Sequence, residues 1–408
     1  MTSRQWRLGV ALVLGLGCPG RTAGVAPRAP VRPGLEVLLT DSFHLVRGRR
    51  VGLVSHQSGV DHDGVSGVDR LLAAGVRVTA LFSPEHGFRG TADPGEAVAT
   101  TTDPKTGLPI YSLYGRNSAP TDSMLADVDV LVIDLQDAGA RYYTYLYTTV
   151  QVMRSAERRG LPVIVLDRPN PVGGLVQGNV LDTAYRTPVG LVAVPMRHGM
   201  TLGELARLAR HDFGLTTRLT VVPVAGWKRS EYFDATGLPF IPPSPNLRSL
   251  EALIHYPGTC LFEGTTLSVG RGTDHPFEQV GAPWLDSTRV LAALARAHLP
   301  GVSFQVVTFT PVRPGDGKFA DTLLAGIRLT VVDRAAYDPT RTALALLDAI
   351  AATGAPLFTA DHRHFQRLIG ERLDSTLFGS NRWSTLARDW ERQRAAFLER
   401  RRPFLLNY

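Results

Sequence analysis

Short apolar segments alternate with helical segments along the first half of the chain, and this alternation constrains the fold more than any other feature. Four segments rich in Val, Ile and Leu end at polar or Gly/Pro positions, and they span 50–60, 76–87, 127–139 and 161–174. Stretches with helical composition and spacing lie between them, at 64–75 and 147–160. Continuous apolar strands separated by helices are typical of a parallel sheet covered on both faces. Residues 35–200 are therefore predicted to form a doubly wound α/β domain.

The second half is less regular, and we interpret residues 201–408 as a second α/β domain that ends in helices. A helix is predicted at 201–214 and a strand at 218–227, followed by a long loop-rich stretch. Two more strands are predicted at 303–311 and 326–333. A chain of 408 residues is long enough to divide into two domains.

Polar side chains follow each of the four predicted strands at the point where the strand ends. They are the segments Ser55–Gln57, Ser83–His86, Asp134–Asp137 and Asp167–Asn170. In a doubly wound sheet, ligands bind outside the carboxyl ends of the strands. The sequence therefore predicts a site at this edge, with Glu85, His86 and Asp137 as candidate catalytic residues and His56, Gln57 and Asn170 as candidate binding residues.

Glu85 leads these candidates because a carboxyl beside an apolar sheet is poorly solvated as an anion, which suits a general acid. A loop-fixing glutamate is the alternative. Asp134 is interpreted as an orienting residue, since it ends a buried strand. Arg141 and Tyr142 follow in the same loop, where a guanidinium suits a substrate carboxylate and a tyrosine ring suits a sugar.

A long loop-rich stretch of the second half supplies the remaining candidate binding residues. Its proline-rich part, 242–249, presents Asn246, and its glycine-rich part, 256–284, contains Glu263, Arg271 and Asp274. A long structural loop is the alternative interpretation, but loops of this length inside compact domains are usually functional.

Motifs for the common cofactors are missing from the sequence. No G-x-G-x-x-G follows the first strand, and neither a phosphate-binding loop nor G-x-S-x-G occurs. Four histidines, His56, His86, His198 and His275, lack the spacing of a zinc site. We therefore predict neither a cofactor nor a metal.

The formal charge of +7 does not indicate a nucleic-acid partner. Lysine occurs only three times, and the arginines are scattered among acidic residues. The densest basic run, 388–403, has helical spacing and is predicted to be the solvated face of a helix.

The first 24 residues have the features of a secretory signal. Arg4 and Arg7 precede an apolar core at 8–17 that is too short to span a bilayer. Cys18 then offers a lipoprotein processing site, and residues 25–34 form a proline-rich tether. The protein is therefore predicted to be exported to the periplasm or beyond, either free or anchored by a lipid on Cys18. Once Cys18 is removed or lipidated, Cys260 has no disulfide partner.

Eight segments, in this order, resemble the exo-β-N-acetylmuramidases of bacterial cell-wall turnover. They read SHQSGVD, FSPEHGFRG, PIYSLYG, DLQDAGARYYTY, LDRPNPVGG, VPMRHGMTLGELA, PPSPNL and YPGTCLFEGTTLSVGRGTDHPFEQVGAPW. The resemblance runs from about residue 35 to the carboxyl end. It implies a Rossmann-like first domain, a smaller second domain and a cleft between them. It also implies release of non-reducing-end N-acetylmuramic acid from peptidoglycan fragments, with Glu85 as the acid.

Several alternatives stay open at this stage. The chain could be a non-catalytic muropeptide- or sugar-binding protein, or an esterase or amidase acting on wall fragments. Asp137, Glu263 and Asp274 are candidates for a second carboxylate, and the substrate's own acetamido oxygen is a further nucleophile. Arg141 or Arg271 is expected to pair with the lactyl carboxylate. The oligomeric state is left open.

Overall fold

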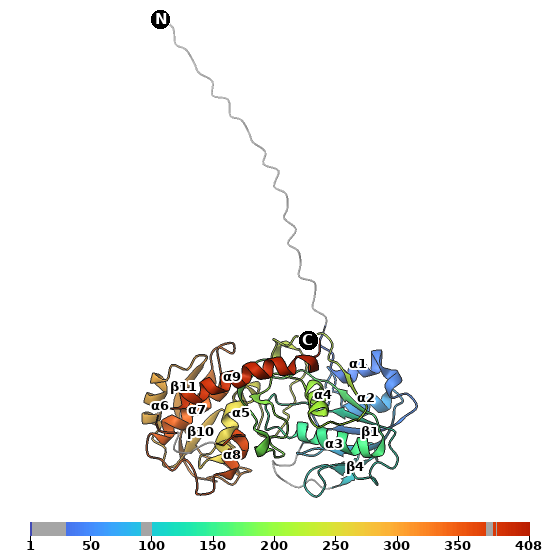
Figure 1. The fold of residues 1–408 in the computed structure, drawn as a ribbon, viewed down its shortest axis with the longest axis horizontal. Helices are drawn as coiled ribbons and strands as arrows, with labels where there is room; N and C mark the ends of the chain where they lie inside the picture. The colour runs from blue at the N-terminus through green and yellow to red at the C-terminus, as the bar shows by residue number, and fades with distance from the viewer. Residues whose placement is uncertain (2–29, 91–99, 373–377, 381) are drawn as a thin grey trace.

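A computed structural model describes residue 1 and residues 30–90, 100–372, 378–380 and 382–408 of the chain. Two lobes lie side by side in Figure 1, and helix α9 runs across the top of both. The predicted signal sequence, Cys18 and the first part of the predicted tether lie outside the described residues. Among the described helices, none is long and apolar enough to cross a membrane.

The first lobe is built on a seven-stranded sheet with the order β3-β4-β2-β1-β5-β6-β9. Every neighbouring pair is parallel except β3 with β4. The strands are β1 (Arg50–Ser55), β2 (Arg77–Ser83), β3 (Thr101–Thr102), β4 (Pro109–Ser112), β5 (Val130–Asp134), β6 (Val163–Leu166) and β9 (Leu219–Val222). The four strands predicted from apolar segments are thus confirmed.

Helices cover both faces of this sheet, which confirms the doubly wound α/β architecture. The helices are α1 (Gly34–Asp41), α2 (Gly67–Ala73), α3 (Tyr145–Arg159) and α4 (Leu202–Asp212). Apolar residues of α1 and α2 share one buried cluster with one face of the strands, and those of α3 and α4 share a second cluster with the other face. Thr201 and Glu204 form a capping box at the start of α4, so the sequence itself specifies where this helix begins.

The order of the strands fixes where a ligand can bind. β2 lies on one side of β1 and β5 lies on the other, so the chain winds from β1 to β2 and β4 and then crosses back to the other side of β1 at β5. The gap between the carboxyl ends of two such strands is the usual ligand position in doubly wound sheets. The loops after β1, β2 and β5 meet there.

The sheet does not end at residue 200, where sequence reasoning placed the domain boundary. β9 pairs in parallel with β6 through Leu219–Val222, and α4 packs on both strands. The first lobe therefore draws on residues beyond 200, because one more helix and strand continue the same winding.

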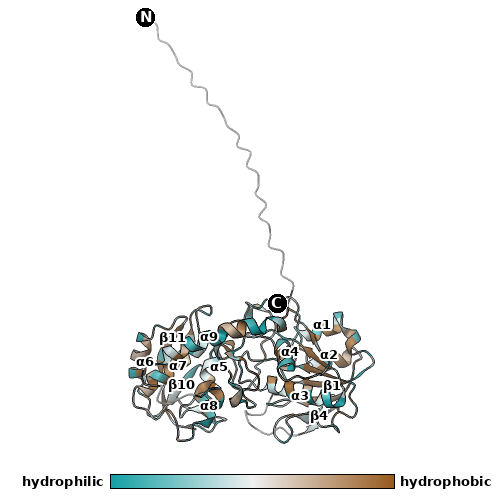
Figure 2. Cartoon of the chain, viewed as in Figure 1, coloured by the Kyte–Doolittle hydropathy of each residue, from teal (hydrophilic) through white to brown (hydrophobic). Residues whose placement is uncertain are grey.

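The second lobe contains a three-stranded antiparallel sheet with the order β10-β12-β11. Its strands are β10 (Gln279–Ala282), β11 (Val302–Phe309) and β12 (Leu324–Val331), and a separate antiparallel pair joins β7 (Gln177–Val180) to β8 (Pro195–Arg197). The helices are α5 (Leu250–Thr259), α6 (Ser287–Arg296), α7 (Pro339–Ala351), α8 (Arg363–Ile369) and α9 (Trp383–Arg401). Figure 2 shows hydrophobic residues gathered inside both lobes and hydrophilic positions along α9. Its exposed arginines pair with acids three residues away, as expected for a solvated helix face.

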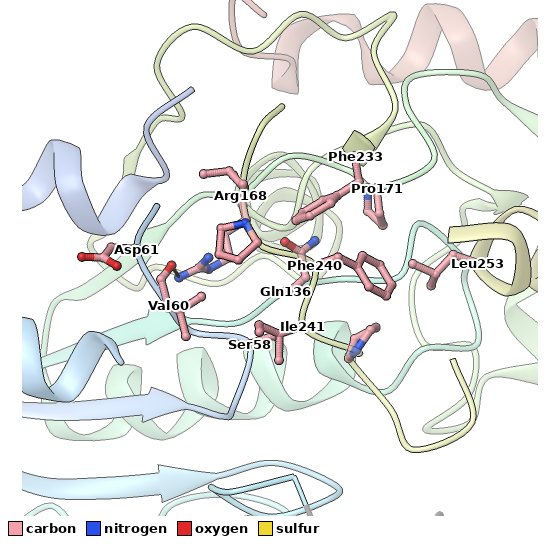
Figure 3. Close-up of a pocket in the computed structure, with 13 residues that line it drawn as sticks. Ser58, Val60, Asp61, Gln136, Arg168, Pro171, Phe233, Phe240, Ile241 and Leu253 are labelled. Carbon is pink, nitrogen blue, oxygen red and sulfur yellow. Dashed lines mark hydrogen bonds between the residues drawn. The ribbon is translucent and has the colours of Figure 1, made fainter. Parts of the chain in front are cut away.

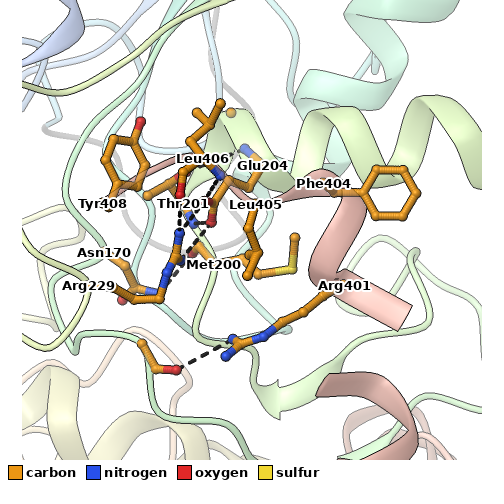
Figure 4. A network of polar contacts seen from close by, with 12 residues as sticks. Asn170, Met200, Thr201, Glu204, Arg229, Arg401, Phe404, Leu405, Leu406 and Tyr408 are labelled. Atoms are coloured by element: carbon orange, nitrogen blue, oxygen red, sulfur yellow. Dashed lines mark hydrogen bonds and ion pairs between the residues drawn. The ribbon is translucent and has the colours of Figure 1, made fainter. Parts of the chain in front are cut away.

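Short 3₁₀ helices complete the described structure, at η1 (Phe43–Leu45), η2 (Thr183–Tyr185), η3 (Phe233–Ala235), η4 (Cys260–Gly264) and η6 (Arg402–Phe404). After η6 the chain returns to the first lobe and joins a buried polar network (Figure 4). Glu204 forms an ion pair with Arg229 and accepts a hydrogen bond from the Leu406 amide at 2.7 Å. The Tyr408 hydroxyl donates to Asp167 at 2.5 Å. These contacts tie the carboxyl end to the ends of β6 and α4.

Candidate active site

The turn that follows β2 carries Glu85. Its backbone closes through a hydrogen bond from the Gly87 amide to the Pro84 carbonyl at 3.1 Å. His86 and Gly87 both have positive φ, 73° and 78°, and a histidine pays a steric cost for that conformation. Glu85 is only 9% exposed and His86 only 3%, so the turn holds a carboxyl and an imidazole inside the protein.

The side chain of Glu85 is fixed by the loop that precedes α3. The Thr144 hydroxyl donates to Glu85 Oε2 at 2.7 Å, and the Tyr145 hydroxyl reaches the Glu85 carbonyl at 3.4 Å. Tyr114 lies on the other side. Burial, together with the charge of Glu85 and a hydrogen bond to it, raises the pKa of Tyr114 to about 12. The carboxyl is therefore surrounded by hydroxyl groups from two separate segments.

His56 directly follows β1, and its ring packs against that of Tyr145, whose hydroxyl contacts the Glu85 backbone. Its ring centroid is 4.7 Å from that of Tyr145, and its Nδ1 accepts a hydrogen bond from the Ser58 amide at 2.9 Å. Burial, and then the nearby charges of His86 and Arg168, lower the pKa of His56 to about 3. The imidazole is thus neutral at physiological pH.

The proline-rich loop 242–246 of the second half closes over these strand ends. Gln57 Nε2 donates to the Pro242 carbonyl at 3.0 Å. The Tyr143 hydroxyl donates to the Pro243 carbonyl at 2.6 Å, and the Tyr145 hydroxyl lies 3.5 Å from the same oxygen. Side chains of the first lobe thus supply the donors for these two proline carbonyls.

A small pocket marks the seam between the strand-end loops and this proline-rich segment. Figure 3 shows Phe240 beside Gln136 and Ile241 beside Ser58. Its free volume of about 10 Å³ is the space of a single water molecule, so a sugar ring does not fit here.

Among the described residues, two buried polar atoms at the carboxyl ends of β1 and β2 lack a hydrogen-bond partner. They are Ser83 Oγ, at the end of β2, and Gln57 Oε1, after β1. Buried polar groups in folded proteins nearly always have partners. An oxygen-rich ligand next to Glu85 would provide them.

A larger groove lies on the other face of loop 242–246. It has a volume of about 750 Å³, within the usual range of about 300–1,000 Å³ for ligand sites. Its wall includes Pro245, Asn246 and Asp274 together with parts of β12 and of the loop after β11. Two of the residues predicted to bind substrate, Asn246 and Asp274, therefore line this groove.

Comparison with known proteins identifies the family. The chain matches the model of the N-terminal domain of exo-β-N-acetylmuramidase NamZ over residues 51–251 and the model of its C-terminal domain over residues 254–407. The chain belongs to the NamZ family of exo-β-N-acetylmuramidases.

Individual relatives agree with this assignment. The chain is 44% identical over 327 residues to the peptidoglycan β-N-acetylmuramidase NamZ of Bacillus subtilis (strain 168), covering 80% of this chain and 78% of the relative. A crystal structure of a DUF1343 family protein from Bacteroides fragilis NCTC 9343 has a TM-score of 0.85 at 32% identity, covering 94% of this chain and all of that one. A second DUF1343 protein of that strain has a TM-score of 0.74 at 31% identity, covering 93% of this chain and 99% of that one.

In this NamZ-family chain, Arg141, which was predicted to pair with a substrate carboxylate, makes its hydrogen bonds to backbone carbonyls of the protein itself. The side chain is 3% exposed. Its Nη1 donates to the carbonyls of Asn179 and Val194, and its Nη2 donates to those of Leu368 and Ile369. The guanidinium cross-links loops inside the NamZ fold.

Tyr142 and Asn170, also predicted to bind substrate, likewise make their hydrogen bonds within the protein. The Tyr142 ring is buried in the core, and its hydroxyl donates to the Pro257 carbonyl at 3.1 Å. The Asn170 amide donates to the Met200 carbonyl at 2.9 Å and accepts from the Val172 amide at 3.0 Å. Both side chains are used by the protein itself.

The carboxylates after β5 have partners within the NamZ fold. Asp134 accepts from Arg168 Nε at 2.6 Å and from Nη2 at 3.0 Å, which agrees with its predicted orienting role. Asp137 Oδ2 accepts from the Gly139 amide at 2.6 Å and lies 3.2 Å from His198 Nε2. Asp137 therefore fixes its own loop, and a direct role in the reaction remains only a prediction.

Glu263 and Arg271 form an ion pair, with Arg271 Nε 2.8 Å from Glu263 Oε1. Lys318 Nζ donates to the carbonyl of Glu263 at 3.0 Å and to that of Thr265 at 2.8 Å, which pins the same loop. Arg271 Nη1 is buried and has no hydrogen-bond partner among the described residues, so one edge of this guanidinium has donors to offer a ligand.

Sequence reasoning missed the residues that hold Glu85. Thr144 and Tyr145 belong to the segment DLQDAGARYYTY and Tyr114 to PIYSLYG, so both motifs were visible. A threonine directly before a helix reads as an ordinary helix start, and nothing local indicates that its hydroxyl faces a carboxyl 59 residues earlier.

Proposed function

We propose that this chain is an exo-acting glycoside hydrolase that releases N-acetylmuramic acid from the non-reducing ends of peptidoglycan fragments. One observation carries the proposal. A buried carboxyl, Glu85, lies at the ligand-binding edge of a doubly wound sheet, in a chain whose two halves match the two NamZ domains. The Bacillus subtilis relative is a peptidoglycan β-N-acetylmuramidase.

Glu85 acts as the general acid in this proposal. Cleavage of a glycosidic bond needs a proton on the leaving oxygen, and a positioned carboxylic acid supplies it. When Glu85 gives up that proton, the Thr144 hydroxyl at 2.7 Å stabilises the new carboxylate. His56 is neutral, and because its Nδ1 accepts from the Ser58 amide, its Nε2 carries the hydrogen and can donate to a sugar oxygen.

A second carboxylate is not required if the substrate's acetamido oxygen attacks the anomeric carbon. Asp137, Glu263 and Asp274 are the candidate partners otherwise. Asp137 Oδ2 lies 3.2 Å from His198 Nε2, and Glu263 forms an ion pair with Arg271. For Asp137, which follows β5 of the same sheet, the variant Asp137→Asn tests whether this carboxylate takes part in the reaction. Turnover equal to wild type removes Asp137 from the reaction, whereas a loss of about 100-fold or more, at unchanged stability, makes it a participant.

The decisive experiment measures sugar release from an aryl N-acetylmuramide. Glu85→Gln keeps the shape of the side chain and removes the acid, so turnover should fall by about 10²–10⁴-fold. Glu399→Gln, an exposed glutamate of α9 paired only with Arg402, is the matched control. Normal turnover by Glu85→Gln would refute the assignment.

The same assay separates the two alternatives. A muropeptide-binding protein binds the sugar without releasing it, and an esterase or amidase releases acid or amine while the glycosidic bond stays intact. Free N-acetylmuramic acid in the wild-type reaction is therefore expected, and its absence would contradict the proposal.

We also propose that the chain is exported, free or anchored through Cys18, because peptidoglycan lies outside the inner membrane. Residues 1–24 provide the signal. Fractionation of cells producing the full chain should place it outside the cytoplasm. Cys18→Ala should release it from membranes if the cysteine carries a lipid, and it should leave a freely soluble form unchanged.

A further inference from the structure

The groove beyond loop 242–246 is strongly cationic. Arg248, Arg313 and Arg328 line it, and Asp274 is the one acidic residue on its wall within the described chain. No described carboxylate forms an ion pair with any of these three arginines. Unpaired guanidinium groups around a concave surface favour an anionic ligand.

Arg328 is the most firmly positioned of the three. It lies in the middle of β12, and its Nε and Nη2 donate to Gln279 Oε1 at 3.2 and 2.8 Å. Gln279 is fully buried and donates in turn to Thr273 Oγ1 at 3.1 Å. A neutral amide thus orients the guanidinium without cancelling its charge, which leaves the charge for a ligand.

The groove is joined to the catalytic turn by one short loop. Pro243 contacts Tyr143 and Tyr145 on the side of Glu85. Pro245, two residues later, lines the groove. A glycan chain whose terminal sugar lies at Glu85 can therefore continue across this loop into the groove.

We propose that the groove binds a carboxylate on the part of the glycan that remains after cleavage, with Arg328 as its main partner. This inference rests on the proposed function. In peptidoglycan every second sugar carries a lactyl ether, whose carboxyl is either free or linked to a peptide that ends in carboxylates. Both sources offer the same chemistry, and the leaving glycan brings the next lactyl group two sugars beyond the one released.

The test compares two trisaccharides of N-acetylmuramic acid, N-acetylglucosamine and N-acetylmuramic acid. One has a free lactyl carboxylate on the last sugar, and the other has that carboxyl converted to an amide. For the wild-type enzyme, kcat/KM should be about 10- to 100-fold higher on the free acid. Arg328→Gln should remove most of this preference, chiefly by raising KM on the acid.

Arg289→Gln is the matched control, because Arg289 is exposed on α6 and its described hydrogen bond involves only its backbone amide. Arg328→Lys, which keeps the charge, guards against a folding defect and should retain part of the preference. A third substrate, with a dipeptide on the distal lactyl group, identifies the source. If the dipeptide substrate is again preferred over the amide, the groove binds the peptide carboxylate. If it is turned over no better than the amide, the groove binds the lactyl carboxylate.

An equal loss on acid and amide for Arg328→Gln would overturn the proposal, and so would a wild-type enzyme without any preference. Calorimetric binding of both trisaccharides to Glu85→Gln protein gives a readout that does not depend on turnover. If the wild type fails on the aryl N-acetylmuramide, the proposed function fails. The proposal about the groove is then still tested by calorimetry. It requires tighter binding of the acid than of the amide, and Arg328→Gln should abolish that difference in affinity.

Discussion

Replacing Arg141 should destabilise the protein rather than alter its choice of sugar. Its guanidinium donates to the carbonyls of Asn179, Val194, Leu368 and Ile369 at 2.9–3.2 Å. These acceptors belong to β7, to the segment before β8 and to the end of α8, which are far apart in the sequence. Arg141→Met fills much of the same volume and removes every donor.

The size of the effect follows from the acceptors left behind. Val194 O also accepts from the Leu181 amide, and Ile369 O from Asn179 Nδ2, so these two keep a donor. The carbonyls of Asn179 and Leu368 lose the donor that Arg141 gives them. At about 1–3 kcal/mol for each unsatisfied carbonyl, the free energy of unfolding should fall by about 2–6 kcal/mol. That is a large part of the roughly 5–15 kcal/mol that stabilises a typical domain.

Urea denaturation followed by fluorescence measures this difference as a lower midpoint at unchanged slope. Turnover should then be compared on aryl N-acetylmuramide and on the matching N-acetylglucosaminide, at a temperature where both proteins are folded. Both rates should fall together, or not at all. Normal stability with a selective loss on the muramide would refute this reasoning and restore Arg141 as a carboxylate-binding residue.

Three further predictions follow from contacts around the sheet edge. Thr144→Val should lower turnover about 10-fold at nearly unchanged stability, because one charge-assisted hydrogen bond to Glu85 is lost; Thr144→Ser should recover most of it, and equal defects in both variants would contradict the role. The His56 pKa is about 3 when folded and about 6.5 when unfolded, so the unfolded chain binds the extra proton and stability falls as pH drops from about 6.5 toward 3. His56→Asn should remove this decline, about 1.4 kcal/mol per pH unit, in urea titrations compared pH by pH with wild type; the same slope in both proteins would count against it. Comparison with wild type is needed because Asp167, whose pKa is raised to about 6 mainly by burial, takes up a proton in the folded state and gains stability over part of the same interval. Tyr408→Phe should cost about 1–3 kcal/mol in urea denaturation, since Asp167 loses the hydroxyl donor at 2.5 Å, and a change below about 0.5 kcal/mol would show that water replaces it.

Local sequence was sufficient to predict the four central strands of the first lobe, β2, β1, β5 and β6, and the position of Glu85 after β2. An apolar run such as the one that ends at Ser83 has few ways to be buried, and the polar residues after it must lie at the edge of the sheet. Arg141 shows the limit of this logic. It follows β5 in a motif loop, but sequence does not indicate whether its side chain points into a cleft or back toward carbonyls contributed by residues 368 and 369.

The partners of Glu85 and the cationic groove could not be predicted from the sequence, for a related reason. Thr144, Tyr114 and Arg328 come from three segments whose meeting depends on tertiary packing. The predicted domain boundary at residue 200 differs from the structure for another reason. A helix followed by a strand is equally compatible with the start of a new domain and with one more helix and strand of the first sheet. The pairing of β9 with β6 decides between them.

The large hydrophobic cluster has a consequence for how the molecule loses its structure. It runs without interruption from Ile133 and Val150 in the first lobe to Leu346 and Phe397 in the second. Neither half can separate without exposing part of that shared interior to water. Calorimetry should therefore show one cooperative melting transition for the whole molecule. Residues 51–251 or 254–407 expressed alone should aggregate, and only their co-expression should restore soluble protein.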